Sequence, residues 1–219
     1  MLRPGGVNRA GVAPADPVLG AQRLGAPLPR RKGSHVSSPT ATANTLHGEN
    51  FAILDELLRD CCIELMADYG LPAQQTDVGT ETATGVAVAA VDFSGRDVRG
   101  TIGLRMTSSV VLQTYRAALG RSIELDSPEA KDWSCELANQ LIGRLKNKLR
   151  SYEVSFNVNS PRWLQIFPVA ELERALRRRF ICDGGNFAGY LDVMIAPGFV
   201  FVPRASDAPL AHEGDLVLF

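Results

Sequence analysis

Residues 127–150 separate core-facing and polar side chains cleanly onto two opposite faces of a helix. Ser127 can cap such a helix, Pro128 suits its first turn, and Glu129 complements the positive end of its dipole. An amphipathic helix of this length needs a core to pack against, so the fold must offer it a larger apolar surface. Its core-facing side comprises Ala130, Ser134, Leu137, Leu141 and Leu145, flanked by Trp133 and Ala138.

The remainder of residues 46–219 mixes helical spacing with strand-like alternation. Gly70 and Pro72 end one amphipathic stretch, and the turn sequence Ser94-Gly95-Arg96-Asp97 joins two alternating stretches into a hairpin. The expected helices cover 50–69 and 169–180, with a further helix through Val110 and Leu119 that Thr107 or Ser108 caps and Gly120 ends. The expected strands cover 86–93, 98–106, 154–158, 186–195, 199–202 and 216–219. This order predicts an α+β fold in which an antiparallel sheet packs against helices on one face.

Residues 1–45 differ from the rest of the chain in composition. They carry six basic side chains and one acidic one, six of the 13 prolines, six of the 20 glycines and no aromatic residue. Such a segment cannot bury enough apolar surface to offset its ordering entropy, so we expect a flexible, disordered tail before a domain at 46–219. The cluster Arg30-Arg31-Lys32 either contacts an acidic surface or is simply solvated.

Composition and charge exclude several classes of protein. The net charge of −1 argues against a general nucleic-acid binder, and 45% hydrophobic residues argue against wholesale disorder. No apolar run reaches the roughly 20 residues that cross a bilayer or resembles a signal peptide, which predicts a cytoplasmic protein without a membrane partner.

Familiar catalytic and metal-binding motifs are missing from the sequence. It contains no Gly-rich phosphate loop, dinucleotide fingerprint or nucleophile elbow, and its three histidines form no zinc-binding pair. The cysteines lack metal-ligand spacing and lie in apolar patterns, so we interpret them as buried free thiols; they are Cys61, Cys62, Cys135 and Cys182.

The polar face of the 127–150 helix holds the most informative group of residues. Asp132, Glu136, Asn139 and Gly143 fall within roughly 60° of one another on a helical wheel. Glycine inside an exposed helix costs about 1 kcal/mol relative to alanine. Gly143 therefore indicates that another group approaches the helix backbone closely.

The pattern Asp132-x3-Glu136-x2-Asn139, with Pro161 22 positions after Asn139, resembles the signature of the CheC/CheX/FliY chemotaxis phosphatases. The Val98–Leu104 strand and the helix after it resemble the CheX type, in which the motif occurs once per chain. The resemblance covers residues 50–219 and implies a CheX-like α+β domain.

The resemblance also implies an activity. Members of the family hydrolyse the aspartyl phosphate of a CheY-like response regulator receiver domain in chemotaxis or two-component signalling. Asn139 would orient the attacking water and Glu136 would pair with the receiver lysine, with Asp132 and Gly143 at the binding surface. No metal or cofactor of the chain's own is implied, because the receiver supplies Mg²⁺, and CheX-type proteins form homodimers with a continuous sheet.

Other interpretations of the same residues stay open at this point. Glu136 and Asn139 could form an ordinary solvated face, Asp132 could serve only the helix dipole, and Pro161 could only shape a turn. Arg177-Arg178-Arg179 could bind phosphate or mark a solvated helix end. Functional alternatives are a non-catalytic receiver-binding or scaffold module of the same fold, and a sensor of a small molecule or peptide.

Overall fold

The computed structural model describes residues 40–77, 86–164 and 175–203, all within a compact unit that spans Ser38–Phe219. A second unit, Met1–Ser37, lies outside the described residues. The helices are α1 (Thr40–Ala67), α2 (Ser108–Leu119), α3 (Pro128–Leu149) and the 3-10 turn η1 (Arg150–Tyr152). The strands are β1 (Gln74–Gln75), β2 (Val86–Gly95), β3 (Val98–Thr107), β4 (Phe156–Val158), β5 (Arg162–Leu164), β6 (Leu176–Cys182) and β7 (Gly185–Ile195).

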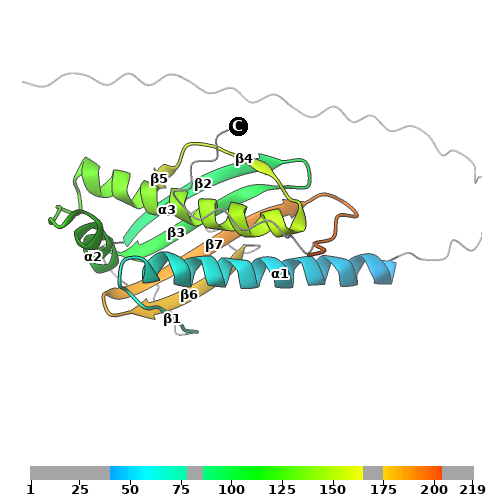
Figure 1. Cartoon of the computed structure of the whole chain (residues 1–219), viewed down its shortest axis with the longest axis horizontal. Coiled ribbons are helices and arrows are strands. Elements are labelled where there is room, and N and C mark those ends of the chain that lie inside the picture. The colour runs from blue at the N-terminus through cyan, green and yellow to red at the C-terminus, as the bar shows by residue number, and fades with distance from the viewer. Residues whose placement is uncertain (1–39, 78–85, 165–174, 204–219) are drawn as a thin grey trace, which may run out of the picture. The chain divides into compact units, whose positions relative to one another are not determined.

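The strands form one antiparallel sheet in the order β1-β6-β7-β3-β2-β4, with β5 also paired to β2 (Figure 1). The predicted hairpin is confirmed: β2 and β3 pair from Val86↔Thr107 to Ser94↔Arg99. β4 and β5 pair in succession along the free edge of β2, at opposite ends of that strand. The sheet confirms the antiparallel α+β fold that the sequence predicts.

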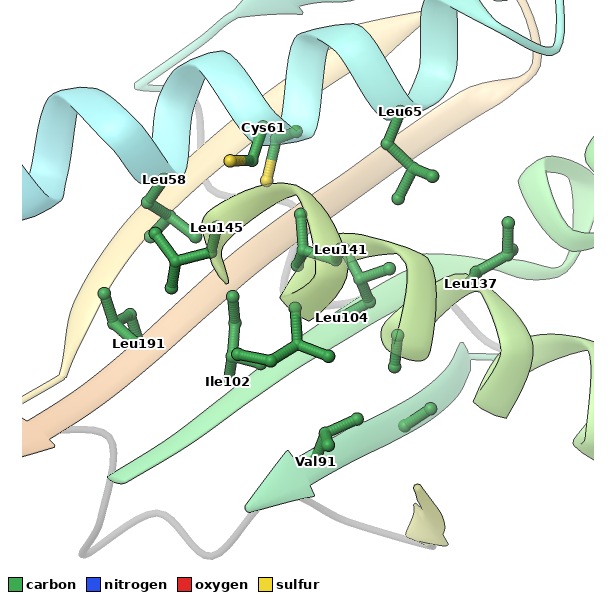
Figure 2. Packing of buried hydrophobic residues seen from close by; sticks show 14 of the residues in the cluster. Leu58, Cys61, Leu65, Val91, Ile102, Leu104, Leu137, Leu141, Leu145 and Leu191 are labelled. Atoms are coloured by element: carbon green, nitrogen blue, oxygen red, sulfur yellow. The ribbon is translucent and has the colours of Figure 1, made fainter. Parts of the chain in front are cut away.

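Helices α1 and α3 lie against the same face of the sheet (Figure 1). Because strand side chains alternate, one set from β2, β3 and β7 points at these helices and forms the core with them. Each fully buried leucine contributes roughly 1.5–3 kcal/mol to folding. Figure 2 shows the packing of Leu58, Cys61 and Leu65 from α1, Leu137, Leu141 and Leu145 from α3, and Val91, Ile102, Leu104 and Leu191 from the sheet.

A glycine in β7 allows α1 to approach the sheet. A Cβ added at Gly189 would overlap the Sγ atom of Cys62. Cys61 and Cys62 are both buried; burial raises the pKa of Cys61 to about 12 and that of Cys62 well above its ordinary value. Cys61 and Cys62 are therefore packing groups, as predicted. Cys135 and Cys182 are also free thiols, but they are only partly buried, so the prediction that they are buried is wrong.

The N-terminal helix is longer than expected. It begins at Thr40, ten residues before the predicted start, so residues 40–45 of the expected tail are helical. Extending a helix costs far less than nucleating one, which explains why a segment without clear periodicity joins it. Residues 1–39 lie outside the described part of the chain.

The C-terminal part of the chain corrects two predicted elements. Leu176–Cys182 is strand β6 and not the end of a 169–180 helix, because an Asp183-Gly184 turn pairs it with β7 and stacks Phe180 on Phe187. Residues 199–202 form no strand, so the strand predicted there is wrong. The strand predicted at 216–219 lies outside the described residues. The Arg177–Arg179 run is thus in a strand, where Arg178 pairs with Asp55 of α1.

Candidate functional site

Helix α3 begins as its sequence predicts. The Ser127 side chain accepts a hydrogen bond from the Ala130 backbone N–H at 3.1 Å, Pro128 is the first helical residue, and Glu129 lies in the first turn. The cap satisfies one of the free N–H groups at the helix start. From there 22 residues continue without interruption to Leu149, so residues on α3 sit on a rigid support.

The four predicted site residues share one exposed side of α3. Asp132, Glu136 and Asn139 are exposed and Gly143 is half-exposed, whereas the residues on the opposite side are buried. We call Asp132, Glu136, Asn139 and Gly143 the α3 stripe. The structure therefore brings together the residues that the helical wheel grouped.

Glu136 and Asn139 differ in their hydrogen bonding. The Gln140 Nε2 group donates to Glu136 Oε1 at 3.1 Å and leaves the second carboxylate oxygen open. The Asn139 carboxamide makes no hydrogen bond within the described part of the chain, and neither does Asp132. The stripe thus presents one oriented carboxylate beside one carboxamide with all of its donors and acceptors available.

Within the described part of the chain, no packing contact requires a glycine at position 143. A Cβ placed there would meet no atom within 4 Å, and its φ angle is not in the left-handed region. Alanine would suit the same backbone better by about 1 kcal/mol. That an outside group approaches the helix backbone at Gly143 stays a prediction.

A group of aromatic side chains packs along one flank of α3, around Trp133. Trp133 Nε1 donates to Thr114 Oγ1 at 3.0 Å, and the rings of Tyr69 and Tyr115 pack edge-on against Trp133 at centroid distances of 5.8 and 5.5 Å. Sequence reasoning placed Trp133 at the flank of the core but missed Tyr69 and Tyr115. Neither tyrosine is close to Trp133 in sequence, so only the fold shows the contact.

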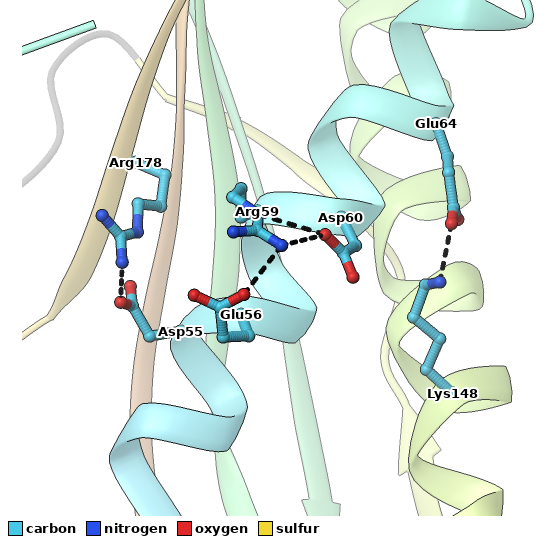
Figure 3. A network of polar contacts seen from close by, with 7 residues as sticks. All are labelled: Asp55, Glu56, Arg59, Asp60, Glu64, Lys148 and Arg178. Atoms are coloured by element: carbon cyan, nitrogen blue, oxygen red, sulfur yellow. Dashed lines mark hydrogen bonds and ion pairs between the residues drawn. The ribbon is translucent and has the colours of Figure 1, made fainter. Parts of the chain in front are cut away.

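Ion pairs between helices fix α3 along α1. Lys148 Nζ lies 2.7 Å from Glu64 Oε1, and Arg144 pairs with Asp68 at the end of α1. Figure 3 shows the Lys148–Glu64 pair and the Arg178–Asp55 pair that ties α1 to β6. Partly exposed pairs of this kind contribute about 0–1 kcal/mol each, so they orient the helices more than they stabilise them.

Pro161 lies in the turn between β4 and β5, on the edge of the sheet and not on the α3 stripe. Partial burial would raise the pKa of Asp92, but hydrogen bonds from Thr101 and Arg162 outweigh it and hold that pKa below its ordinary value. The charged Asp92 thereby anchors Arg162, the residue after Pro161. Lys131 of α3 lies 4.9 Å from the Trp163 ring, which brings β5 against the helix. Pro161 thus shapes a turn, and the contacts of Arg162 with Asp92 and of Trp163 with Lys131 hold that turn in place.

The stripe is a helix surface and not a cavity. A hollow of about 210 Å³ lies beside the start of α3, lined by Ser134, Trp163, Leu125 and others, but no stripe residue lines it. Within residues 40–77, 86–164 and 175–203, no three His, Cys, Asp or Glu side chains are grouped to hold a metal ion. Nor does any described helix have the length and apolarity to span a bilayer. An exposed stripe on a rigid helix suits a protein partner better than a small molecule.

Comparison with known proteins relates part of this chain to a protein family. Residues 87–174 match the family model for chemotaxis phosphatase CheX. This range includes all but the first residue of β2 and the whole of β3, α2 and α3. No curated protein matches the sequence.

Solved structures share the fold at low sequence identity. The Vibrio vulnificus chemotaxis protein CheX is 17% identical, with a TM-score of 0.53 over 63% of this chain and 97% of that one. A CheC-like superfamily protein from Shewanella sp. PV-4 is 15% identical, with a TM-score of 0.51 over 64% and 96%. The CheX-CheY-BeF3-Mg²⁺ complex from Borrelia burgdorferi is 19% identical, with a TM-score of 0.51 over 63% and 96%. The described part of this chain therefore has the fold of CheX-type chemotaxis proteins, and its residues 87–174 match the chemotaxis phosphatase CheX family model.

Proposed function

We propose that the chain is a phosphatase that hydrolyses the aspartyl phosphate of a CheY-like response regulator receiver domain. The observation that carries the proposal is the pairing of an oriented Glu136 carboxylate with an unbonded Asn139 carboxamide on one exposed side of α3. The match of residues 87–174 to the chemotaxis phosphatase CheX family model supports it. The Borrelia burgdorferi CheX is bound to CheY in its crystal structure, and we propose a partner of the same type here.

Glu136 would dock the receiver. Its open carboxylate oxygen can accept a charge-assisted hydrogen bond from the lysine of the receiver active site. Because Glu136 lies one helical turn before Asn139, docking at Glu136 would bring Asn139 to the phosphoryl group.

Asn139 would position the attacking water. A carboxamide both accepts and donates hydrogen bonds at any physiological pH, so it can hold a water in line with the phosphorus–oxygen bond without changing protonation. Phosphoryl transfer depends mainly on such positioning and on neutralising charge. We propose that the receiver supplies the neutralising groups, its own Mg²⁺ and lysine, and that the chain needs no metal or cofactor of its own.

Asp132 and Gly143 would contact the receiver on either side of Glu136 and Asn139. Gly143 would let the receiver approach the helix backbone, and Asp132 would make a contact at the rim. We further propose a cytoplasmic homodimer, the form that the family resemblance implies.

The direct test is the decay of a phosphorylated receiver with Mg²⁺ present, with and without the full-length chain. We expect faster loss of phosphate with the chain, and no acceleration after the Mg²⁺ is chelated. Because the sequence does not identify the substrate, several receivers from the same organism should be tested. Binding to a phosphorylated receiver without faster decay would overturn the proposal in favour of a non-catalytic docking module.

The Gly143→Ala variant should separate stability from docking. Alanine should raise the free energy of unfolding by up to about 1 kcal/mol, since its methyl group meets open space. The same methyl group should weaken the receiver complex at least about fivefold by crowding a close contact. Chemical denaturation and a receiver-binding titration measure the two effects.

Gly48→Ala is the matched control for this variant. Gly48 also lies in a helix, α1, with no atom within 4 Å of an added Cβ. It should gain stability in the same way and leave receiver binding unchanged. Equal receiver affinity for Gly143→Ala and wild type would remove Gly143 from the docking surface.

A further inference from the structure

We infer that Tyr69 and Gln140 form a hydrogen-bonded relay that holds the Glu136 carboxylate in position for the receiver. The inference rests on the proposed function and extends it to two positioning residues outside the motif. The relay has two links: Tyr69 Oη donates to Gln140 Oε1 at 2.6 Å, and Gln140 Nε2 donates to Glu136 Oε1 at 3.1 Å.

Tyr69, the first residue of the relay, is held in a fixed position. Tyr69 lies in the turn that ends α1, where its backbone N–H donates to the Met66 carbonyl and the positive φ of Gly70 closes the turn. Its ring packs edge-on against Trp133, one of the partly buried residues packed against the core. The hydroxyl is therefore held by contacts on both its backbone and its ring.

Only one orientation of the Gln140 amide satisfies both neighbours. Glu136 is a carboxylate and can only accept, so the amide must turn its N–H group toward it. The carbonyl oxygen then faces Tyr69, whose hydroxyl donates. The opposite orientation would place the amide oxygen against the Glu136 oxygen. Partial burial and the nearby Glu136 charge raise the pKa of Tyr69, which keeps the donating proton on the hydroxyl.

An exposed glutamate without such a partner samples several rotamers and must be ordered when a partner binds. Ordering one flexible side chain at an interface costs enough to weaken binding about two- to tenfold. The relay has already restricted Glu136 before the receiver arrives. It does not include Asn139, so it should act on the binding of the receiver and not on the chemical step.

The Tyr69→Phe variant tests the first link. It keeps the ring against Trp133 and removes only the hydroxyl. In the receiver assay we expect the concentration for half-maximal acceleration to rise about three- to tenfold, with the maximal rate unchanged. Gln140→Met, which keeps the chain length but removes the amide, should give the same result.

Tyr115→Phe is the matched control. The Tyr115 ring packs on the same Trp133 in the same edge-on geometry, but its hydroxyl donates to Glu129 and not to Gln140. Loss of this hydroxyl should leave the half-maximal concentration as in wild type. Because the two links act in series, Tyr69→Phe and Gln140→Met combined should lose no more than either alone. A wild-type half-maximal concentration for Tyr69→Phe, or fully additive losses, would overturn the relay.

A measurement on the free protein separates the relay from the phosphatase proposal. Side-chain ¹³C relaxation at Glu136 should show larger motion in Tyr69→Phe than in wild type, and no change in Tyr115→Phe. Equal Glu136 motion in wild type and Tyr69→Phe would refute the relay even for an active phosphatase. Greater motion in Tyr69→Phe would support the relay even if no receiver were dephosphorylated, an outcome that would reject only the proposed function.

Discussion

The Asn139→Ala variant should lose at least about 100-fold in receiver dephosphorylation, because misplacing a reacting group by about 1 Å already costs this much. Its affinity for the phosphorylated receiver should fall far less, since the proposed docking group is Glu136. The residue is exposed and makes no hydrogen bond within the described residues, so the fold should tolerate the change. Phosphate decay, receiver binding and thermal unfolding measure the three properties.

Asn157→Ala provides the same substitution away from the stripe. Asn157 is exposed on β4, between Phe156 and Val158, which turn toward the helix side of the sheet. This variant should dephosphorylate the receiver at the wild-type rate. If Asn139→Ala did so as well, Asn139 would not position the water.

Charge reversal at Glu136 should have the second large effect. Glu136→Lys replaces the proposed partner of the receiver lysine with a like charge, and losing one side of such a pair typically weakens binding by at least about 30-fold. The maximal rate at saturating receiver should change less than the affinity. A binding titration at two salt concentrations measures this, and the loss should shrink at higher salt, which screens the repulsion.

Glu49→Lys makes the same change in net charge at another exposed helical position. Glu49 lies in α1, outside the α3 stripe, and has no hydrogen bond or ion pair within the described residues. It should bind the receiver as wild type does. Equal weakening by both variants would point to overall charge and not to a specific contact at Glu136.

Local sequence patterns were sufficient to predict where the helices in the central part of the fold begin and end. Ser127 caps α3 and Gly120 ends α2 in the left-handed conformation, both as the sequence predicted. Thr107 occupies the N-cap position of α2, but its side chain makes no capping hydrogen bond. These signals are read within one helical turn, so they do not depend on the rest of the fold.

The helix predicted over 169–180 failed because helical spacing and strand pairing compete in its second half. Leu172 and Leu176 suggested a helix that ran to Phe180, but the Asp183-Gly184 turn makes Leu176–Cys182 the partner of β7. This Asp-Gly pair is a strong hairpin signal that could have corrected the prediction. Strands β1 and β5, of two and three residues, are too short to show a pattern, and only pairing with β6 and β2 defines them.

The sequence by itself determined which residues share the exposed side of α3, because the 3.6-residue period is a local property of the chain. The positions of Asp132, Glu136, Asn139 and Gly143 on that side follow from it. Tertiary structure alone decided what supports them. Tyr69 is 71 residues from Gln140, and their hydrogen bond exists only because the end of α1 packs beside α3. Such contacts depend on how whole elements pack on the sheet, which no local pattern encodes.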